Sequence, residues 1–524
     1  MRKGRIKMLT PTEALQSLNR RIKREWKIAF LSAFILGLLI HMPVMLSDIP
    51  NHDGLDSMYF DQNMITSGRW FLMIACGFSS YYTLPWLIGV LGLLFLALSA
   101  AALTELLEVR DSVAIVLISG LLVSFPALAS TFAYVFTLDG YMLALFLAIL
   151  AVLFTKKKRL GFLGGGICLA FSMGTYQAYV SVAMLLSIYC ILMTLMDTLT
   201  LREKLQKSLR YLYMGLLGAG MYYVILQVLL RIQGKELDTY QGINTLESAG
   251  ASGEGLMEML AVSYRDFGAF SLKGNVLFNG WISAAAIIIL GISAAWTLTA
   301  LCLRKKWWKN PAFFVIMALL AAVLPLVTNA ILFISPDLTY HLLMRYQWVI
   351  YLIVMTAFVS RYAKALPGNG AMQWCALLGA GALVFHYGVT DNIGYSNLEK
   401  RYEKTYAYCV RLLDRIEQTE GYYQGIPIAI VGVVGDHQFP LTDITGDVTS
   451  NMIGLNGDSL LYTSDNYEAF MKNYLGATLN FLPAQAMEDI YESPEYVEME
   501  SFPGKTSTKV VDGILYVKTE NVNH

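Results

Sequence analysis

Long apolar runs set the strongest limit on what this chain can fold into. The sequence carries about eleven runs of roughly 17 to 25 residues, the length with which an α-helix crosses a bilayer. The mean hydropathy of +0.50 and the share of hydrophobic residues, 56% against 15% charged, agree with that interpretation. We therefore predict a mainly α, multi-pass membrane protein with about eleven transmembrane helices. The predicted spans are 28–46, 86–106, 113–130, 137–155, 160–174, 176–196, 211–231, 277–303, 311–334, 346–363 and 371–389.

Basic residues predict the orientation of these spans. Clusters of lysine and arginine fall in alternate connections, at 156–159, 201–210, 304–309 and 361–364. The positive-inside rule places them in the cytoplasm together with a basic arm, residues 1–27. We expect a plasma-membrane protein with a cytoplasmic N-terminus and a multi-span region, 28–389, whose outer loops include 47–85 and 232–276.

The chain changes character after about residue 390. Residues 390–524 are polar, with a helical pattern at 398–418 and strand-like runs at 426–434 and 514–520. This length suffices for a small α/β domain. An odd number of spans places that domain outside the cell.

Several functional classes lack support in the sequence. The six cysteines show neither metal-ligand spacing nor a disulfide framework, and no Walker A, HExxH or GxSxG motif is present. The glycines of 164–174 follow no soluble strand, so they are typical of helix packing rather than of a nucleotide-binding loop. The triplet Gly435-Asp436-His437 holds one carboxylate and one imidazole, which is weak evidence for a metal site. Lys+Arg and Asp+Glu balance at 39 each, and no basic-aromatic patch indicates nucleic acid. No cofactor is indicated, and the participation of a divalent cation is left open.

A charged residue beside a membrane span costs free energy, because lipid solvates charge poorly. Such residues are therefore candidates for function. The stretch PNHDGLDSMYFDQNMITSGRWF, residues 50–71, contains Asp53 and Asp56 three positions apart, and Asp48 precedes it at the mouth of the first span. A partly buried carboxylate at this place can act as a general base on a hydroxyl group. The alternative interpretation is a solvated loop with a helix cap.

Three further polar places lie at the outer ends of spans. Asp139 begins the fourth span, where it suits either a hydroxyl-rich ligand or a helix cap. Tyr176 and Gln177 mark a break between two apolar runs, and could contact a sugar or belong to an aromatic belt. Arg345, with His341 nearby, lies on the side that is poor in basic clusters, so it suits a phosphate unless it pairs with an aspartate such as Asp139 or Asp337.

The order of these motifs resembles the bacterial GtrII-type glucosyltransferase family. The resemblance rests on NHDG (51–54), SGRWF (67–71), LDGYMLALFLAILAV (138–152), TYQAYVS (175–181) and MRYQWV (344–349). It covers roughly residues 25 to 390 and reaches the segment 401–423. It implies a GT-C type enzyme that takes a sugar, glucose by the family's name, from a polyprenyl phosphate. The sugar would pass to a cell-surface glycan on the outer face of the bilayer.

The resemblance also implies roles for residues. Asp53 is the expected general base, with Asp56 and Asp48 as substitutes, and Arg69 and Arg345 are expected to bind the donor phosphate. The expected sugar or acceptor contacts are His52, Asp139, Tyr176, Gln177 and His341. His52 stands where relatives carry a second acid, so this chain departs from a two-carboxylate pattern.

Two other functional classes compete with the transferase. A flippase or transporter of lipid-linked sugars also has many spans and few buried charges, but should show paired broken helices in two related halves. A membrane scaffold would bind a partner through its outer domain, and would not need Asp53.

Overall fold

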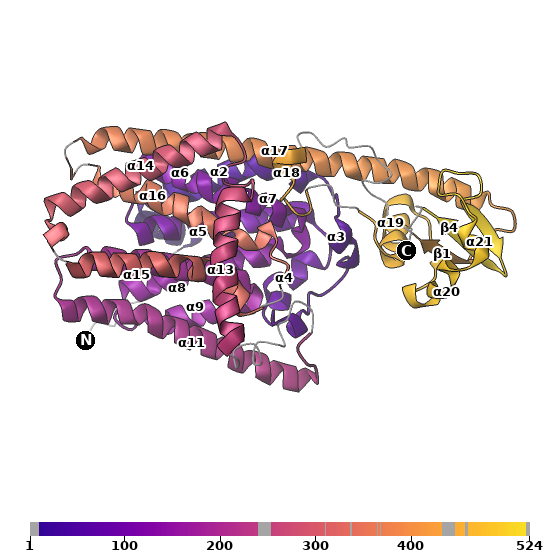
Figure 1. The fold of residues 1–524 in the computed structure, drawn as a ribbon, viewed down its shortest axis with the longest axis horizontal. Helices are drawn as coiled ribbons and strands as arrows, with labels where there is room; N and C mark the ends of the chain where they lie inside the picture. The colour runs from indigo at the N-terminus through magenta and orange to yellow at the C-terminus, as the bar shows by residue number, and fades with distance from the viewer. Residues whose placement is uncertain are drawn as a thin grey trace.

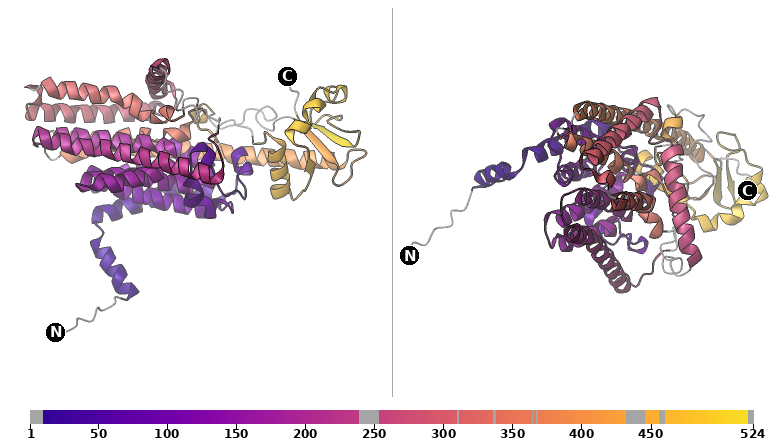
Figure 2. Two further views of the ribbon diagram at one scale, coloured as in Figure 1. Left: turned by 90° about the horizontal axis from the view of Figure 1, so that it is seen from below. Right: turned by 60° about the vertical axis from the view of Figure 1, so that its left-hand side comes forward.

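Long apolar helices run side by side in a bundle, and a small mixed domain lies at one end of it (Figure 1). The computed structural model describes residues 10–238, 253–309, 311–335, 338–363, 365–366, 368–431, 446–455 and 460–519. The N-terminal helix α1 (Pro11–Arg21) projects from the end of the bundle that is far from the small domain, as Figure 2 shows.

The bundle confirms the prediction of a mainly α, multi-pass membrane protein. In the described part of the chain, nine helical segments are long and apolar enough to cross a bilayer, and a bent pair gives a tenth. The helix α9 (Gly161–Thr175) is apolar but shorter. The nine are α2 (Arg24–Leu46), α5 (Pro85–Leu107), η2 with α8 (Val135–Lys157), η3 with α10 (Gln177–Leu195), α11 (Leu201–Gln233), α14 (Trp281–Arg304), α15 (Pro311–Thr328), η7 with α16 (Leu342–Tyr362) and α17 (Asn369–Glu417).

The third predicted span, 113–130, is broken. It consists of α6 (Ser112–Ser124) and α7 (Pro126–Ala133), which meet at an angle of 44°. Pro126 lacks the backbone N–H that would continue the helix, and the residue before it, Phe125, has an extended backbone. The break places α7 and the turn after it, η2 (Val135–Thr137), at the end of the bundle near the small domain (Figure 1).

Other boundaries differ from the prediction for local reasons. The helix α11 begins ten residues before the predicted span 211–231, because Thr200 and Glu203 form a capping box on a polar first turn. The predicted span 311–334 ends as an α-helix at Thr328, and a 3₁₀ turn, η6 (Ala330–Phe333), follows. The span predicted from 277 begins at Trp281.

Ion pairs gather the basic ends of several helices at one end of the bundle. Glu108 pairs with Lys156 at 2.7 Å and with Arg361 at 2.8 Å. Glu105 pairs with Lys157 and, at 2.7 Å, with Lys23. This end lies opposite the small domain (Figure 1). The basic connections 156–159 and 361–364 and Lys23 of the basic arm therefore share one side of the bundle, while the placement of that side in the cytoplasm stays a prediction.

The small domain is built around a four-stranded sheet with the strand order β2-β1-β4-β3. The strands are β1 (Pro427–Val431), β2 (Asn480–Phe481), β3 (Thr508–Val511) and β4 (Ile514–Lys518). Strand β1 is parallel to β2 and β4, and β3 is antiparallel to β4. The helices of this part are α19 (Ser464–Leu475), α20 (Glu488–Tyr491) and α21 (Pro494–Val497), whereas α18 (Gly446–Thr449) lies beside α17 at the end of the bundle (Figure 1).

One helix joins the bundle to the small domain. Helix α17 passes residue 390 without a break, so the predicted last span and the helical pattern at 398–418 are parts of one helix of 49 residues. Its last turns bury Cys409, Leu412 and Ile416 in the core beneath the sheet. Cys76 is buried in the core of the bundle, and both Cys76 and Cys409 are free thiols. The triplet 435–437 and Asp337 lie outside the described residues.

Helix α13 (Gly253–Lys273) lies across the bundle rather than along it (Figure 1). It comes from the predicted outer loop 232–276, and contacts α15 and η6. Its exposed apolar side chains include Leu256, Met257 and Leu272. An amphipathic helix in this orientation is typical of one that rests at a membrane interface.

Candidate functional site

The first predicted outer loop is held on the bundle by its SGRWF motif. This loop contains α3 (His52–Asp56), η1 (Ile65–Ser67) and α4 (Leu72–Ser80). The Phe71 amide donates to the Gly174 carbonyl at 2.7 Å, and the Trp70 ring packs against Gly174. A Cβ on Gly174 would lie 2.4 Å from that ring, so glycine is required where the loop meets the break between α9 and α10.

The short helix α3 is held from two sides. On the bundle side, the Asn51 side chain caps the helix by accepting from the Gly54 amide, and donates to the Ala133 carbonyl at 3.0 Å. On the other side, Leu55 is buried in the core of the small domain. Asp53 lies between these two anchors, so both the bundle and the small domain fix its position.

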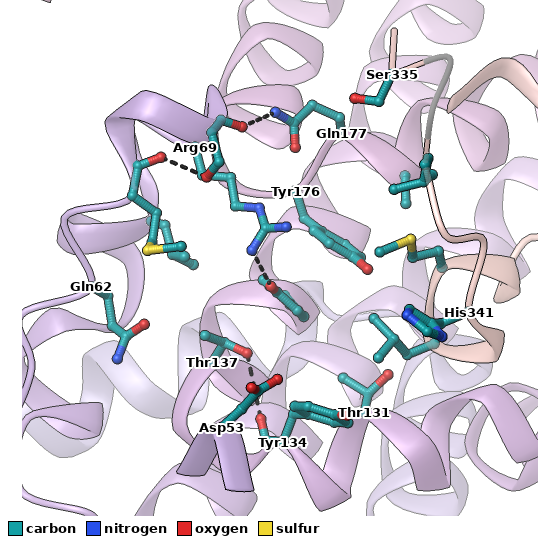
Figure 3. Close-up of a pocket in the computed structure, with 18 of the residues that line it drawn as sticks. Asp53, Gln62, Arg69, Thr131, Tyr134, Thr137, Tyr176, Gln177, Ser335 and His341 are labelled. Atoms are coloured by element: carbon teal, nitrogen blue, oxygen red, sulfur yellow. Dashed lines mark hydrogen bonds between the residues drawn. The ribbon is translucent and has the colours of Figure 1, made fainter. Parts of the chain in front are cut away.

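A cavity of about 400 Å³ opens where α3, η1 and the helix breaks come together (Figure 3). Its walls combine the first outer loop, the turn after α7, the break before α10 and the turns around η6 and η7. The polar side chains that line it are His52, Asp53, Gln62, Thr66, Ser67, Arg69, Thr131, Tyr134, Thr137, Tyr141, Tyr176, Gln177, Asp238, Ser335 and His341. This cavity is called the first cavity below.

Arg69 supplies a positive charge to the first cavity. Its Nη1 donates to the Tyr141 hydroxyl at 3.2 Å, and its guanidinium lies 5.5 Å from the centre of the Tyr176 ring. The Tyr141 and Tyr176 rings are stacked, with their centres 4.0 Å apart. The aromatic contacts orient the guanidinium at the cavity wall, where it can attract an anionic group.

Tyr176 and Gln177 reach the first cavity because α9 ends beside them. Tyr176 has an extended backbone after Thr175, and the 3₁₀ turn η3 (Gln177–Tyr179) follows. Gln177 Nε2 donates to the Ser67 carbonyl at 2.9 Å. The Tyr176 hydroxyl is buried, and no described residue forms a hydrogen bond with it. A buried hydroxyl without a hydrogen-bond partner destabilises the fold unless a ligand or a water molecule forms a hydrogen bond with it.

Asp53 contributes a carboxylate to the first cavity, and Asp238 contributes another. The Asp53 side chain is 52% exposed, and His52 Nε2 lies 3.3 Å from its Oδ1. Figure 3 shows Asp53 on the side of the cavity opposite Arg69. The structure thus brings together six of the residues expected from the sequence, namely His52, Asp53, Arg69, Tyr176, Gln177 and His341.

The other expected site residues lie elsewhere. Asp56 Oδ1 accepts from Asn466 Nδ2 at 2.5 Å, and Asp48 faces Tyr474, so both substitutes for the base are turned toward α19. Asp139 is buried at the start of α8, where it accepts from Ser79 and from the Gly140 amide. Asp139 thus lies inside the first turn of α8, bonded to α4 through Ser79, and it does not line the first cavity.

Arg345 lies outside the first cavity, held by a partner that the sequence did not indicate. It forms two hydrogen bonds of 2.7 Å with Asp266 of α13. Its Nε also donates to the Tyr340 carbonyl at 3.1 Å. The two arginines expected at the donor phosphate therefore line different cavities.

A comparison with family models identifies the family of the chain. Residues 42–360 match the family model described as Glucosyl transferase GtrII. The chain belongs to this GtrII glucosyltransferase family. It is therefore a membrane-embedded glycosyltransferase of the glucosylation kind, and its substrates include a sugar donor and a glycan acceptor. No curated protein matches the chain.

The matched region of this GtrII protein contains cavity residues that sequence reasoning missed. They are Gln62, Thr66, Ser67, Thr131, Tyr134, Thr137, Tyr141, Asp238 and Ser335. Gln62 is the most unusual, because it is buried with a positive φ of 58° and no described residue bonds its Nε2. A backbone conformation that non-glycine residues rarely adopt is often found at functional sites. No local sequence signal marks this glutamine.

The described part of this family member contains no group of three or more metal-ligating side chains.

Proposed function

We propose that this GtrII protein moves glucose from a polyprenyl-phosphate donor to a hydroxyl of a cell-surface glycan on the outer face of the plasma membrane. The carrying observation is that Asp53 and Arg69 line the same cavity at the end of the bundle away from its basic connections. One carboxylate and one cation are the charged groups that this transfer requires. A GT-C type arrangement is part of the proposal.

The location of the first cavity suits a donor that is anchored in lipid. A polyprenyl-linked sugar keeps its chain in the bilayer and its phosphate at the headgroup level. The cavity opens at the ends of the helices, so the sugar can enter it without extraction of the lipid. A water-borne acceptor can reach the same place, since the Asp53 side chain is half exposed.

The chemical step is a single displacement with Asp53 as the base. The oxygen of the acceptor hydroxyl attacks the anomeric carbon of the glucose and forms the new glycosidic bond. The bond between that carbon and the phosphate oxygen breaks, and its electron pair leaves with the polyprenyl phosphate. The proton of the hydroxyl passes to the Asp53 carboxylate. Arg69 stabilises the negative charge that grows on the phosphate.

Side chains around these two groups would position the glucose. Gln177 is held by the Ser67 carbonyl, and Tyr176 and Gln62 carry buried polar atoms that no described residue bonds. Sugar hydroxyls could complete those hydrogen bonds. His52 would orient Asp53 through the contact of 3.3 Å between Nε2 and Oδ1.

The test uses the purified full-length protein in nanodiscs. Radiolabelled polyprenyl-phosphate glucose is added together with a glycan fraction from the cell envelope, and the products are separated by thin-layer chromatography. We expect transfer by the native protein, a loss of about 100-fold or more for Asp53→Asn, and transfer close to native for Asp56→Asn. Movement of intact lipid-linked glucose across vesicles without transfer would support a transporter and overturn the proposal, as would normal transfer by Asp53→Asn.

A further inference from the structure

A second cavity of about 480 Å³ adjoins the first and shares His341 and Ile453 with it. Its remaining walls come from three places. They are the end of α13 with the turn after it, the turn around η7, and residues 446–455, called the return segment below. A transfer between two substrates requires two binding places that meet at the reacting atoms. Two cavities with a common wall meet that requirement.

The lining of the second cavity is suited to hydrogen bonding. It contains the Asp266–Arg345 pair, Lys273 and the polar side chains of Ser450 and Asn451. A polyprenyl chain would exclude water from these polar groups and offer them no hydrogen bonds, whereas a ligand rich in hydroxyls would add hydrogen bonds to those that they already form. The Phe270 and Tyr340 rings add apolar faces of the kind found in ligand pockets.

Arg345 keeps donor capacity in spite of its ion pair. A guanidinium has five N–H groups, and Asp266 and the Tyr340 carbonyl use three of them. The ion pair and the Tyr340 ring, 3.7 Å from the guanidinium carbon, hold the group in one orientation. The remaining N–H groups are thus presented in a fixed geometry, which lowers the cost of binding a ligand.

The return segment is held against the bundle by hydrogen bonds and by buried side chains. Asn451 Nδ2 donates to the Gly274 carbonyl at 2.6 Å, and Arg401 Nη2 donates to the Leu455 carbonyl at 3.3 Å. Met452 and Leu455 are buried in the core of the bundle. The chain beyond the last span therefore returns to the bundle and completes a cavity there.

We infer that the second cavity binds the acceptor glycan, holding the sugar units next to the hydroxyl that receives glucose. This inference rests on the proposed function. His341 and Ile453 stand at the junction, where the acceptor hydroxyl would pass from the second cavity to Asp53 in the first. The ligand class is a hydroxyl-rich oligosaccharide of the cell envelope.

One experiment narrows the second cavity without changing the first. Ala269 of α13 lines only the second cavity, so Ala269→Trp fills part of it. The control is Gly268→Trp, which adds the same side chain at the next position, where a Cβ would meet no atom within 4 Å. We expect Ala269→Trp to raise the KM for the envelope glycan by about tenfold or more, with the KM for the lipid donor within about twofold of native. Equal effects on both KM values, or none on the glycan, would overturn the inference.

A crosslinking measurement covers the case in which Ala269→Trp folds poorly. The photoreactive residue p-benzoylphenylalanine is placed at position 269, and at 268 as the control, and the protein is irradiated with labelled envelope glycan. Glycan crosslinked at 269 well above 268 supports the inference, whereas equal labelling or crosslinks to the lipid donor alone overturn it. Crosslinking needs no transfer of glucose. A protein that captures the glycan but has no transferase activity would therefore contradict the proposed function and still support a glycan-binding site in the second cavity.

Discussion

Arg345 and Asp266 form a bidentate ion pair in which both N–O distances are 2.7 Å. The two side chains are only 10% and 22% exposed. The pair joins α13, which lies across the bundle, to the turn η7 at the start of α16. Charges buried to this degree are stable as long as each keeps its partner. The pair is therefore a structural joint as well as part of the second cavity.

Arg345→Ala should destabilise the protein strongly, because it leaves the Asp266 carboxylate buried without its cation. We expect a loss of about 3 kcal/mol in the free energy of unfolding, seen as a lower thermal midpoint in detergent. The double variant Arg345→Met with Asp266→Leu removes both charges, so it should lose less than Arg345→Ala. If the double variant lost as much stability as the two single variants Arg345→Met and Asp266→Leu together, the two side chains would not be coupled.

Tyr176→Phe should weaken binding of the donor without lowering the stability of the protein. The Tyr176 hydroxyl is buried with no partner among the described residues, so its removal should leave the thermal midpoint unchanged or raise it slightly. If this hydroxyl meets the donor, the same change should raise the KM for polyprenyl-phosphate glucose by about fivefold to tenfold. Both quantities can be measured on one preparation.

Tyr179→Phe provides the matched control for this prediction. Tyr179 is also buried and lies three residues further along the chain, but it lines neither cavity. Its substitution should leave the KM for the donor at the native value. A parallel rise in KM for both variants would point to a general disturbance of the turn η3 instead of a lost contact.

Gly454→Ala should displace the return segment. Gly454 has a φ of 79°, which suits glycine, and a Cβ there would lie 2.9 Å from the Tyr134 ring. Tyr134 lines the first cavity, so the strain falls next to the site. We expect a loss of about 1 to 3 kcal/mol in stability and faster proteolysis near the return segment. Gly476→Ala is the control, because that glycine has a φ of 71° but open space around it, and an equal loss there would show that steric contact with Tyr134 is unimportant.

Hydropathy alone predicted most of the bundle. Apolar runs long enough to cross a bilayer have few other uses, so the helices fall close to the predicted spans. The largest departure, the break at Phe125–Pro126, depends on a proline that a hydropathy window does not weigh. The continuous helix α17 was also missed, because the change from apolar to polar residues near 390 marks the edge of the bilayer rather than the end of a helix.

The site was predictable in part. Asp53 and Arg69 could be proposed because charged residues near spans are rare, and both line the first cavity. The same reasoning could not show which of the neighbouring carboxylates, Asp53 or Asp56, faces the first cavity. Asp56 is three residues from Asp53, yet it faces α19, since Leu55 between them is buried in the small domain. Partners far apart in sequence, such as Asp266 for Arg345, leave no local signal.

The contact between Asp56 and the small domain should depend on pH. The pKa of Asp56 is raised because the surrounding protein partly excludes water from the carboxylate and because Asp53 adds negative charge, while His52 and Asn466 offset only part of this. A carboxyl group with a raised pKa binds its proton more tightly in the folded than in the unfolded protein. Its favourable contribution is therefore complete below the ordinary carboxyl pKa and is lost as the pH rises to the raised value. The Asp56→Asn variant stays neutral, so its thermal midpoint should gain on the native midpoint from about pH 4 upward and then level off. A difference between the two midpoints that is the same at every pH would contradict this account.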